Sequence, residues 1–359
     1  MSKIFNVAVV GAGIGRSHIS EGYLPNADKF KVVAICDLDE ARMGALADEF
    51  HVERRVSKFD DLLTMDDIDI IDICTPPMVH YPMIMAALKA GKHVVCEKPL
   101  VGSLKEIDEV IAVEQQSKGK LMPVFQYRFG NGIQQAKAII DAGLAGTPFV
   151  GTVETLWRRE ADYYAVPWRG KWKTELGGVL MGHAIHPHDM FVYLMGPLKS
   201  LFGRVATRVN PIEVEDCISA SVELESGALG SFTASLGSAD EITRIRLVFD
   251  NLTIESDHAP YNPGALAWKI LSRNDGTKSA IADLLKDWKD VPPRFTTQMA
   301  RFHDSLTSGT PLPVTSADSR RALETVTAFY YSSRTRQEVI FPIGTDHPNY
   351  RSWLPEGFA

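Results

Sequence analysis

Short apolar runs alternate with amphipathic stretches through the first 127 residues of this 359-residue chain. The apolar runs are rich in β-branched residues and lie at Phe5–Val10, Lys31–Cys36, Ile68–Cys74, Lys92–Cys96 and Lys120–Phe125. Stretches with helical spacing separate them, at Leu38–Phe50, Val79–Ala90 and Ser103–Gln116. Continuous apolar strands that alternate with helices predict a parallel sheet covered by helices on both faces. We therefore predict a doubly wound α/β domain over residues 1–127.

The pattern changes after Phe129, where several strands follow one another without helices between them. These strands are predicted at Phe149–Trp157, Leu198–Thr207, Cys217–Leu224, Ala228–Leu236 and Thr243–Phe249. Successive strands of this kind favour an antiparallel sheet. Later helices are predicted at Thr296–Ser308 and Ala317–Ser333. Because a chain of this length exceeds one ordinary core, we predict a second α/β domain over residues 128–359.

The first strand runs into a glycine-rich turn that suits a dinucleotide. Gly11, Gly13 and Gly15 permit a tight turn and let backbone N–H groups approach a pyrophosphate. A plain turn is the alternative, because the third glycine comes one residue earlier than in the full GxGxxG pattern. Asp37 ends the second strand 22 residues after Gly15, close to the spacing of a ribose-binding acid. Its charge would repel a 2′-phosphate, and Leu38 follows it, so NAD is favoured over NADP.

A lysine stands directly after the apolar run His93–Cys96, in the triplet Glu97-Lys98-Pro99. Open α/β sheets bind their ligands at the carboxyl ends of their strands. The proline excludes helical backbone angles at Lys98, which holds the lysine extended. A turn with a solvated lysine is the alternative. Three further candidates for the cofactor site follow the end of another strand: Thr75, Pro76 and His80. For His80, an exposed position at the start of a helix is an equally good interpretation.

The segment Trp157–Asp189 is dense in aromatic and cationic residues. It holds three of the six tryptophans, two adjacent tyrosines and five basic residues: Trp157, Trp168, Trp172, Tyr163, Tyr164, Arg158, Arg159, Arg169, Lys171 and Lys173. Exposed aromatic rings beside cations suit a sugar-like ligand, including an acidic or phosphorylated one. Core packing of the tryptophans and a solvated charged face is the alternative.

A histidine cluster closes that segment, with His183, His186, His188 and Asp189. Three histidines and a carboxylate could hold a metal ion. No HxxxH pair with a partnered glutamate is present, so we expect no metal. A histidine aimed at a substrate hydroxyl explains the cluster better, because histidine titrates near neutral pH.

Charge and composition narrow the class of protein. The net charge of −7 argues against a nucleic-acid or anionic-membrane surface. No apolar stretch near the start is long enough for a signal segment or a membrane span, so we expect a cytoplasmic protein. The four cysteines show no CxxC spacing, which argues against a structural zinc or a redox pair.

Taken together, these features resemble the Gfo/Idh/MocA family of NAD(P)-dependent sugar and cyclitol oxidoreductases. The resemblance covers nearly the whole chain and rests on an ordered set of motifs: Gly11-Ala12-Gly13, Ala90–Pro99, Tyr127-Arg128-Phe129, Trp168-Arg169-Gly170, and Gly177-Gly178 leading to His186-Pro187-His188-Asp189. It implies a Rossmann domain followed by an α/β domain with a large open, mainly antiparallel sheet. It also implies a homodimer or homotetramer formed through that sheet.

The resemblance assigns roles to individual residues. Lys98 and His186 become the catalytic residues, which bracket the reacting hydroxyl. The implied cofactor-binding residues are Gly11, Gly13, Ile14, Gly15, Asp37, Thr75, Pro76, His80, Glu97, Lys98, Gln126, Trp168 and Arg169. The implied substrate-binding residues are Lys98, Tyr127, Arg128, Tyr164, Trp172, His183, His186 and Asp189.

One position departs from the family pattern. Many members carry an aspartate four residues before the catalytic histidine, where this chain has Gly182. His183, Asp189 or Glu175 could supply the missing function, or Lys98 could carry the proton transfer alone.

The predicted activity is reversible hydride transfer between NAD and a secondary alcohol of a sugar, cyclitol or sugar acid. A regulator that senses NAD(H) or a sugar without chemistry is one alternative, which Gly182 favours and the intact Lys98 and His186 oppose. An enzyme that retains its cofactor is another, either an aldose–aldose oxidoreductase or one that catalyses redox-assisted elimination. The expected partner is a small sugar-like molecule, with no nucleic acid and no membrane.

Overall fold

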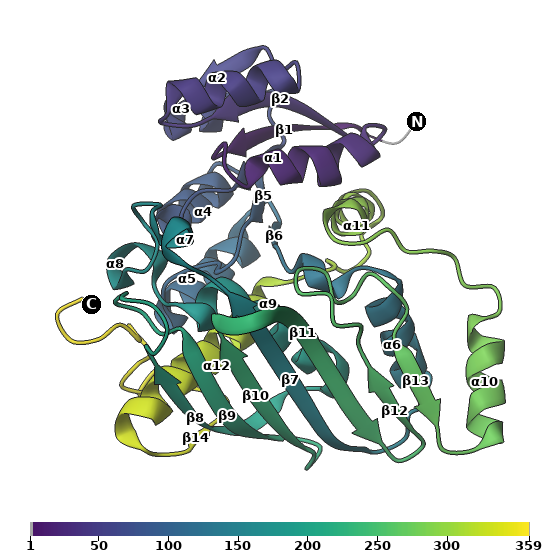
Figure 1. The fold of residues 1–359 in the computed structure, drawn as a ribbon. Coiled ribbons are helices and arrows are strands. Elements are labelled where there is room, and N and C mark those ends of the chain that lie inside the picture. The colour runs from purple at the N-terminus through teal and green to yellow at the C-terminus, as the bar shows by residue number, and fades with distance from the viewer. Residues whose placement is uncertain (1–2, 359) are drawn as a thin grey trace. The chain divides into compact units, whose positions relative to one another are not determined.

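The computed structural model describes residues 3–358 and divides into two compact units (Figure 1). The first unit comprises Met1–Phe125 and Phe295–Arg320, and the second comprises Gln126–Arg294 and Arg321–Ala359. The first break lies two residues from the predicted boundary at residue 127. Residues 295–320, which the prediction placed in the second domain, cluster with the first unit instead. The ends of the predicted domains, residues 1–2 and 359, lie outside the described residues.

The reason for this return of the chain is visible in the packing of α11 (Phe295–Ser308). Its buried face lies against the π-helical turn η1 (His18–Tyr23) of the first unit. A Cβ atom at Gly22 would come within 3.3 Å of both Phe295 and Met299, so a larger residue there would require these side chains to shift by a few tenths of an ångström. His303 and Phe302 of α11 also pack edge-on against Phe5 and His93 of the first sheet.

The first unit contains a six-stranded parallel sheet in the order β3-β2-β1-β4-β5-β6. The strands are β1 (Phe5–Val10), β2 (Phe30–Cys36), β3 (Arg54–Val56), β4 (Ile70–Ile73), β5 (His93–Cys96) and β6 (Leu121–Pro123). Its helices include α1 (Gly15–Ser17), α2 (Glu40–Glu49), α3 (Phe59–Leu63), α4 (His80–Lys89) and α5 (Leu104–Gln116). The predicted doubly wound domain is confirmed, although the short elements β3 and α3 were not predicted from the sequence.

The register of this sheet aligns the carboxyl ends of its central strands. Val10 of β1 pairs with Cys36 of β2 and with Ile73 of β4, and Ile73 pairs with Cys96 of β5. The residues that follow these strands therefore lie along one edge, with neighbouring strands about 4.8 Å apart. This edge carries the glycine turn, Asp37, Cys74 and Glu97.

The second unit contains an eight-stranded sheet in the order β13-β12-β11-β7-β10-β9-β8-β14. Its strands are β7 (Pro148–Arg158), β8 (Leu198–Ala206), β9 (Cys217–Leu224), β10 (Leu229–Ser235), β11 (Gly237–Phe249), β12 (Leu252–Glu255), β13 (Lys269–Ser272) and β14 (Val339–Ile340). All neighbours are antiparallel except β7 and β10, so the predicted mainly antiparallel sheet is confirmed. Strands β12 and β13 are short, and the sequence pattern missed them.

One face of the second sheet is covered and the other is open. Helix α9 (Ile185–Met195) packs against β7 and β11 and buries Phe191 against Phe232 of β10. On β9 and β10 buried residues alternate with exposed or half-buried ones, and Ser219, Ser221 and Thr233 are among the exposed residues. This strict alternation is typical of a sheet with one buried face.

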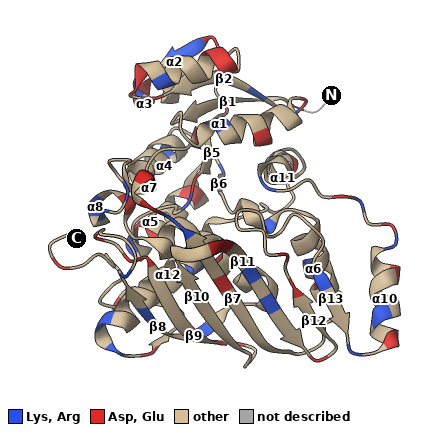
Figure 2. Ribbon diagram, in the orientation of Figure 1, with Lys and Arg blue, Asp and Glu red and all other residues tan. Residues whose placement is uncertain are grey.

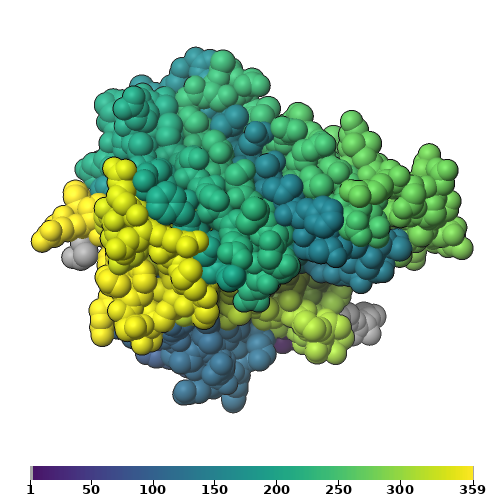
Figure 3. All heavy atoms as spheres, turned by 90° about the horizontal axis from the view of Figure 1, so that it is seen from below, coloured from purple at the N-terminus to yellow at the C-terminus, as the bar shows by residue number. Residues whose placement is uncertain are grey.

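Other helices of the second unit are α6 (Asn131–Asp141), α7 (Ala161–Tyr164), α8 (Trp172–Glu175) and α10 (Asp275–Leu285). Helix α12 (Ser316–Thr335) runs from the first unit into the second. The C-terminal segment, yellow in Figure 3, lies beside teal residues of the second unit. Its Trp353 is fully buried and donates from Nε1 to the carbonyl of Leu176 at 2.8 Å, which fixes that segment.

Opposite charges are interleaved on β7, β11 and β12 (Figure 2). Arg244 of β11 lies 3.4 Å from Glu154 of β7 and 3.1 Å from Glu255 of β12. Among the helices of residues 3–358, none is both long and apolar enough to cross a membrane.

Candidate active site

The three glycines of the turn after β1 differ in the space around their Cβ positions. Gly11 has φ of +104°, and a Cβ there would lie 2.6 Å from the carbonyl oxygen of Cys74. A Cβ at Gly15 would lie 2.7 Å from Val9 Cγ1, so this glycine lets α1 pack closely on the sheet. Beside Gly13 nothing lies within 4 Å of the Cβ position. The turn is thus closed on two sides and open at Gly13, as a pyrophosphate cradle requires.

Gly13→Ala is expected to leave the fold intact and weaken NAD binding. The methyl group meets no protein atom, but it would occupy the space through which a phosphate approaches the backbone N–H groups. Loss of one hydrogen bond to a charged group corresponds to about a tenfold increase in the Kd for NAD. Titration of NADH fluorescence and a thermal melt would check this. Gly11→Ala is the contrasting variant, expected to lower the melting temperature; equal NAD affinity in Gly13→Ala and wild type would contradict the assignment.

Asp37 is held at the end of β2 by the turn itself. Its Oδ2 accepts from the Ala12 backbone N–H at 2.7 Å, and its Oδ1 accepts from Asp39 N–H at 2.9 Å. A carboxylate has further lone pairs, so the fixed group can still accept from a ribose hydroxyl. Arg42 of α2 lies 3.3 Å from Asp37 and is mostly exposed. The sequence argument for NAD considered only the residue next to Asp37 and missed this nearby cation.

Thr75, Pro76 and His80 follow β4 on the same edge. His80 is fully buried, with Nδ1 2.9 Å from the carbonyl of Pro99 and Nε2 2.8 Å from that of Thr75. Burial lowers the pKa of His80. The ring therefore ties two backbone segments together, a placement that argues against the predicted direct contact between the His80 side chain and the cofactor.

A buried charged cluster includes Glu97, the residue before Lys98, and the sequence analysis missed the cluster. His18 Nδ1 lies 2.9 Å from Asp72 Oδ2, and His18 Nε2 lies 3.0 Å from Glu97 Oε1. Burial opposes the charge on the His18 ring, but the Asp72 carboxylate raises its pKa well above the usual value. Burial likewise opposes ionisation of Glu97, yet the hydrogen bond from His18 lowers its pKa. Both ring nitrogens of His18 face carboxyl oxygens, and only a protonated imidazole can donate from both nitrogens.

In the second unit, His186 lies on α9 and is almost fully buried. The ring of Tyr127 stacks on it with centroids 4.5 Å apart and planes inclined by 24°. Next to Tyr127, Arg128 donates from Nε and Nη2 to Asp189 at 2.6 and 2.5 Å. Four predicted site residues are thus brought together. Arg128 and Asp189, however, neutralise each other in the interior rather than offering charges to a substrate.

His183 belongs to a second polar group. Its Nε2 lies 3.2 Å from the hydroxyl of Tyr163, which also accepts from Arg169 Nη1. Glu175 accepts from the Gly170 backbone N–H at 2.5 Å and lies 3.6 Å from Arg169. The sequence suggested helical spacing here; the structure has a π-helical turn, η5 (Leu180–Ala184), before α9.

Glu175 also bears on the departure at Gly182. A Cβ atom at Gly182 would lie 3.7 Å from Glu175 Oε1. Of the three side chains that could replace the missing aspartate, Glu175 thus brings a carboxylate to that position, whereas Asp189 is bound to Arg128.

The three arginines of the segment Trp157–Asp189 are paired with acids, whereas Lys171 donates to the carbonyl of Pro167. Arg158 donates to Glu160, and Arg159 lies 2.8 Å from Glu241 while its guanidinium lies over Trp157, Tyr163 and Tyr261. Trp168 lies under the guanidinium of Arg169, and Trp172 packs edge-on against Tyr330. Because Arg158, Arg159 and Arg169 are engaged with acids, the sequence argument for an acidic or phosphorylated sugar is weakened.

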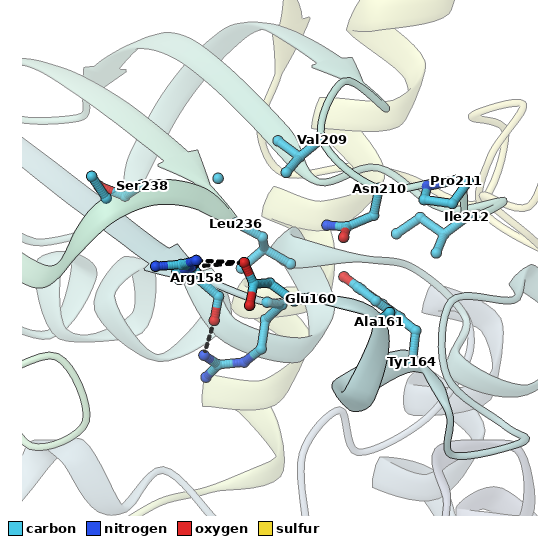
Figure 4. A pocket seen from close by; sticks show the side chains of 13 residues that line it. Arg158, Glu160, Ala161, Tyr164, Val209, Asn210, Pro211, Ile212, Leu236 and Ser238 are labelled. Atoms are coloured by element: carbon cyan, nitrogen blue, oxygen red, sulfur yellow. Dashed lines mark hydrogen bonds and ion pairs between the residues drawn. The ribbon is translucent and has the colours of Figure 1, made fainter.

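A pocket of about 680 Å³ opens beside this segment within the second unit (Figure 4). Its lining includes Arg158, Tyr164, Asn210, Ile212 and Leu236. Among the described residues no acceptor is within reach of the buried Asn210 Nδ2. The pocket thus offers an aromatic ring, apolar faces and an amide beside arginines that are already paired with acids, a mixture suited to a hydroxylated ring.

His188 belongs to the core. It stacks on Phe232 and Phe329 with centroids 4.3 and 5.7 Å apart, and burial lowers its pKa to about 3.

Glu215 is a further buried group that the sequence analysis missed. It accepts from the backbone N–H groups of Gly178 and Leu180 at the start of η5, and burial raises its pKa to about 7.

His188→Phe is expected to make the second unit more resistant to acid. An unfolded histidine titrates near pH 6.5, whereas folded His188 titrates near pH 3, so stability falls as the pH drops through this window. The wild type should lose about 2 kcal/mol between pH 7 and pH 5 through this group. The variant should lose that much less. Urea unfolding at both pH values would check it, and equal losses in the two proteins would count against a neutral buried ring.

Comparison with known proteins agrees with this architecture. Residues 5–125 match the family described as "Oxidoreductase family, NAD-binding Rossmann fold" of GFO_IDH_MocA, and residues 133–255 match the GFO/IDH/MocA C-terminal domain. The two matches together cover more than half of the chain. The chain therefore belongs to the Gfo/Idh/MocA oxidoreductase family.

The individual relatives compared below are at most 33% identical in sequence to this chain. An uncharacterized oxidoreductase of Bacillus subtilis (strain 168) is 33% identical over 64% of this chain and 66% of its own. Myo-inositol 2-dehydrogenase of Thermotoga maritima is 29% identical over 53% of this chain and 54% of its own. Both matches span less than two thirds of the relative's length. The WlbA dehydrogenase of Bordetella pertussis, solved with NADH and UDP-GlcNAcA, has a TM-score of 0.84 at 24% identity and covers 95% of this chain and 100% of its own, which shows a shared fold.

Proposed function

We propose that this protein is an NAD-dependent dehydrogenase that reversibly oxidises a secondary alcohol of a sugar, cyclitol or sugar acid. The observation that carries the proposal is the aligned edge of the parallel sheet. There the ribose-binding candidate Asp37, the open turn at Gly13 and Lys98 follow β2, β1 and β5, which lie within four adjacent strands. A dinucleotide and a cationic side chain at one strand edge are what hydride transfer to a nicotinamide requires.

The two catalytic roles fall to Lys98 and His186. A bound NAD would supply the acceptor for the hydride that leaves the carbinol carbon. One of the two side chains accepts the hydroxyl proton, and the other donates a hydrogen bond to the oxygen as negative charge develops there. Tyr127 holds the His186 ring by stacking on it, so the imidazole keeps one orientation.

The substrate class follows from the second unit and from the relatives. Tyr164, Asn210 and the apolar faces of the pocket suit a hydroxylated ring. Named relatives act on such molecules: one is a myo-inositol 2-dehydrogenase, and another, from Escherichia coli (strain K12), is a D-glucoside 3-dehydrogenase. We favour a neutral sugar or cyclitol, because Arg158 and Arg159 are already paired.

We also propose that the protein forms a homodimer or homotetramer through the open face of the second sheet. Phe202 and Leu229 are exposed on that face, at 39% and 57%. Static light scattering should give an even number of chains, and a monomer would contradict the proposal.

The four cysteines are free thiols, which favours a cytoplasmic location.

The decisive experiment is a panel of neutral sugars, cyclitols and sugar acids, assayed for NADH fluorescence with NAD and with NADP in parallel. We expect turnover with at least one neutral polyol, and faster turnover with NAD. Tighter binding of NADP would overturn the role of Asp37 and point to Arg42. Binding of NAD without any turnover would support the regulator, and cofactor that stays bound through purification would support an internally cycling enzyme.

A further inference from the structure

The His18 cluster is built around the strand end that bears Lys98. His18, Asp72 and Glu97 are at most 7% exposed and come from three elements: η1, β4 and the residue after β5. One imidazolium between two carboxylates leaves the cluster with one net negative charge. Removing ions from water is expensive, so a buried triad of this kind needs a reason beyond stability.

The cluster connects to Lys98 through the second oxygen of Glu97. Glu97 Oε1 faces His18, while Oε2 accepts from the backbone N–H of Lys98 at 3.1 Å. On the other side of the lysine, the carbonyl of Pro99 lies 2.9 Å from His80 Nδ1. The backbone of Lys98 is therefore held between two buried histidines.

We propose that His18 is a positioning residue for Lys98: by holding the Glu97 carboxylate, it fixes the strand end and offsets the Glu97 charge that acts on the Lys98 ammonium. The importance of this for turnover rests on the proposed function, in which Lys98 handles the hydroxyl proton. An unneutralised carboxylate beside that lysine would favour its charged form and make it a poorer base.

All groups that face His18 agree with this assignment. Asp72 and Glu97 accept from its two ring nitrogens, and Cys74 Sγ lies 3.4 Å from Nδ1. Burial raises the pKa of the Cys74 thiol well above its usual value. Tyr23 faces Asp72, and burial raises its pKa as well. Both groups are neutral at working pH, and the remaining neighbour, Phe295, packs on the imidazole with ring centroids 4.5 Å apart. The positive charge of His18 is thus directed to the two carboxylates.

Competitive acetylation of Lys98 with acetic anhydride, followed by mass spectrometry across a pH series, tests this without a substrate. In His18→Gln we expect the labelling midpoint of Lys98 to rise by roughly one pH unit, because Glu97 loses its cation. In Glu97→Gln the midpoint should fall, because a negative charge is removed. His93→Gln is the matched control: it changes a half-buried histidine at the opposite end of β5 and should leave the midpoint unchanged. Shifts of the two variants in the same direction, or no shift, would overturn the proposal.

A second measurement uses the wild-type protein and so does not depend on the folding of His18→Gln. In wild-type protein labelled with ¹⁵N-histidine, the His18 ring nitrogens should both remain protonated at pH 8, and a neutral ring would overturn the proposal. Once a substrate is known, the pH midpoint of kcat in His18→Gln should move with the labelling midpoint while the KM for NAD stays within about twofold. Absence of turnover would sink the proposed function but leave the labelling result intact, so the two failures are distinguishable.

Discussion

Lys98→Met is expected to lower kcat by about 10³-fold or more while NAD still binds with nearly wild-type affinity. Methionine keeps the length and much of the volume of the lysine stem but removes the only group at this position that can move a proton or stabilise an alkoxide. The backbone contacts of residue 98 with Glu97 do not depend on its side chain, so the strand end should keep its shape. The measurements are steady-state turnover of the best polyol and an NADH titration.

The control for this variant is Lys89→Met, which removes an exposed cation at the end of α4. It should change neither turnover nor binding. A Lys98→Met enzyme with near-normal kcat would show that His186 alone handles the proton. A variant that has lost NAD affinity and turnover together would instead place Lys98 on the cofactor.

The features that sequence reasoning predicted well are those that depend on local pattern. The parallel sheet, the glycine turn and Lys98 at a strand end all follow from residues adjacent in the chain. The helix at 296–308 was also predicted within one residue, but its membership of the first unit was not, because helical spacing does not say which sheet receives the apolar face.

Long-range pairing explains what was missed at the candidate site. His18, Asp72 and Glu97 are separated by 54 and 79 residues along the chain, counted from His18. A signal was present, since Asp72 interrupts the otherwise apolar run Ile70–Ile73, and a charged residue in a buried strand requires a partner. The sequence cannot identify that partner without the strand order. In the same way, Arg159 looked like a ligand-binding cation until the fold brought Glu241 to it from 82 residues away.

Asp189→Asn is expected to cost the second unit about 3–5 kcal/mol of stability, the effect of breaking a buried ion pair by removing one partner. Asp189 and Arg128 are each 5% exposed and joined by two hydrogen bonds, so the substitution leaves a guanidinium in the interior with no counter-charge from Asp189. All six tryptophans lie in the second unit, which makes tryptophan fluorescence during urea unfolding a specific readout. The same helix carries His186, so activity at 25 °C should fall as the helix loosens.

The control and the double variant separate a structural pair from a substrate site. Asp141→Asn breaks an exposed ion pair with Lys137 on α6 and should change the unfolding midpoint little. Arg128→Met with Asp189→Leu replaces both charges by apolar groups and should recover most of the lost stability, because no uncompensated ion remains. If Asp189→Asn instead unfolds like the wild type while the KM of the polyol rises, Asp189 contacts the substrate and the interior pairing with Arg128 is not its main role. Recovery in the double variant would establish that these two predicted ligand residues build the wall behind His186 rather than the surface that the substrate meets.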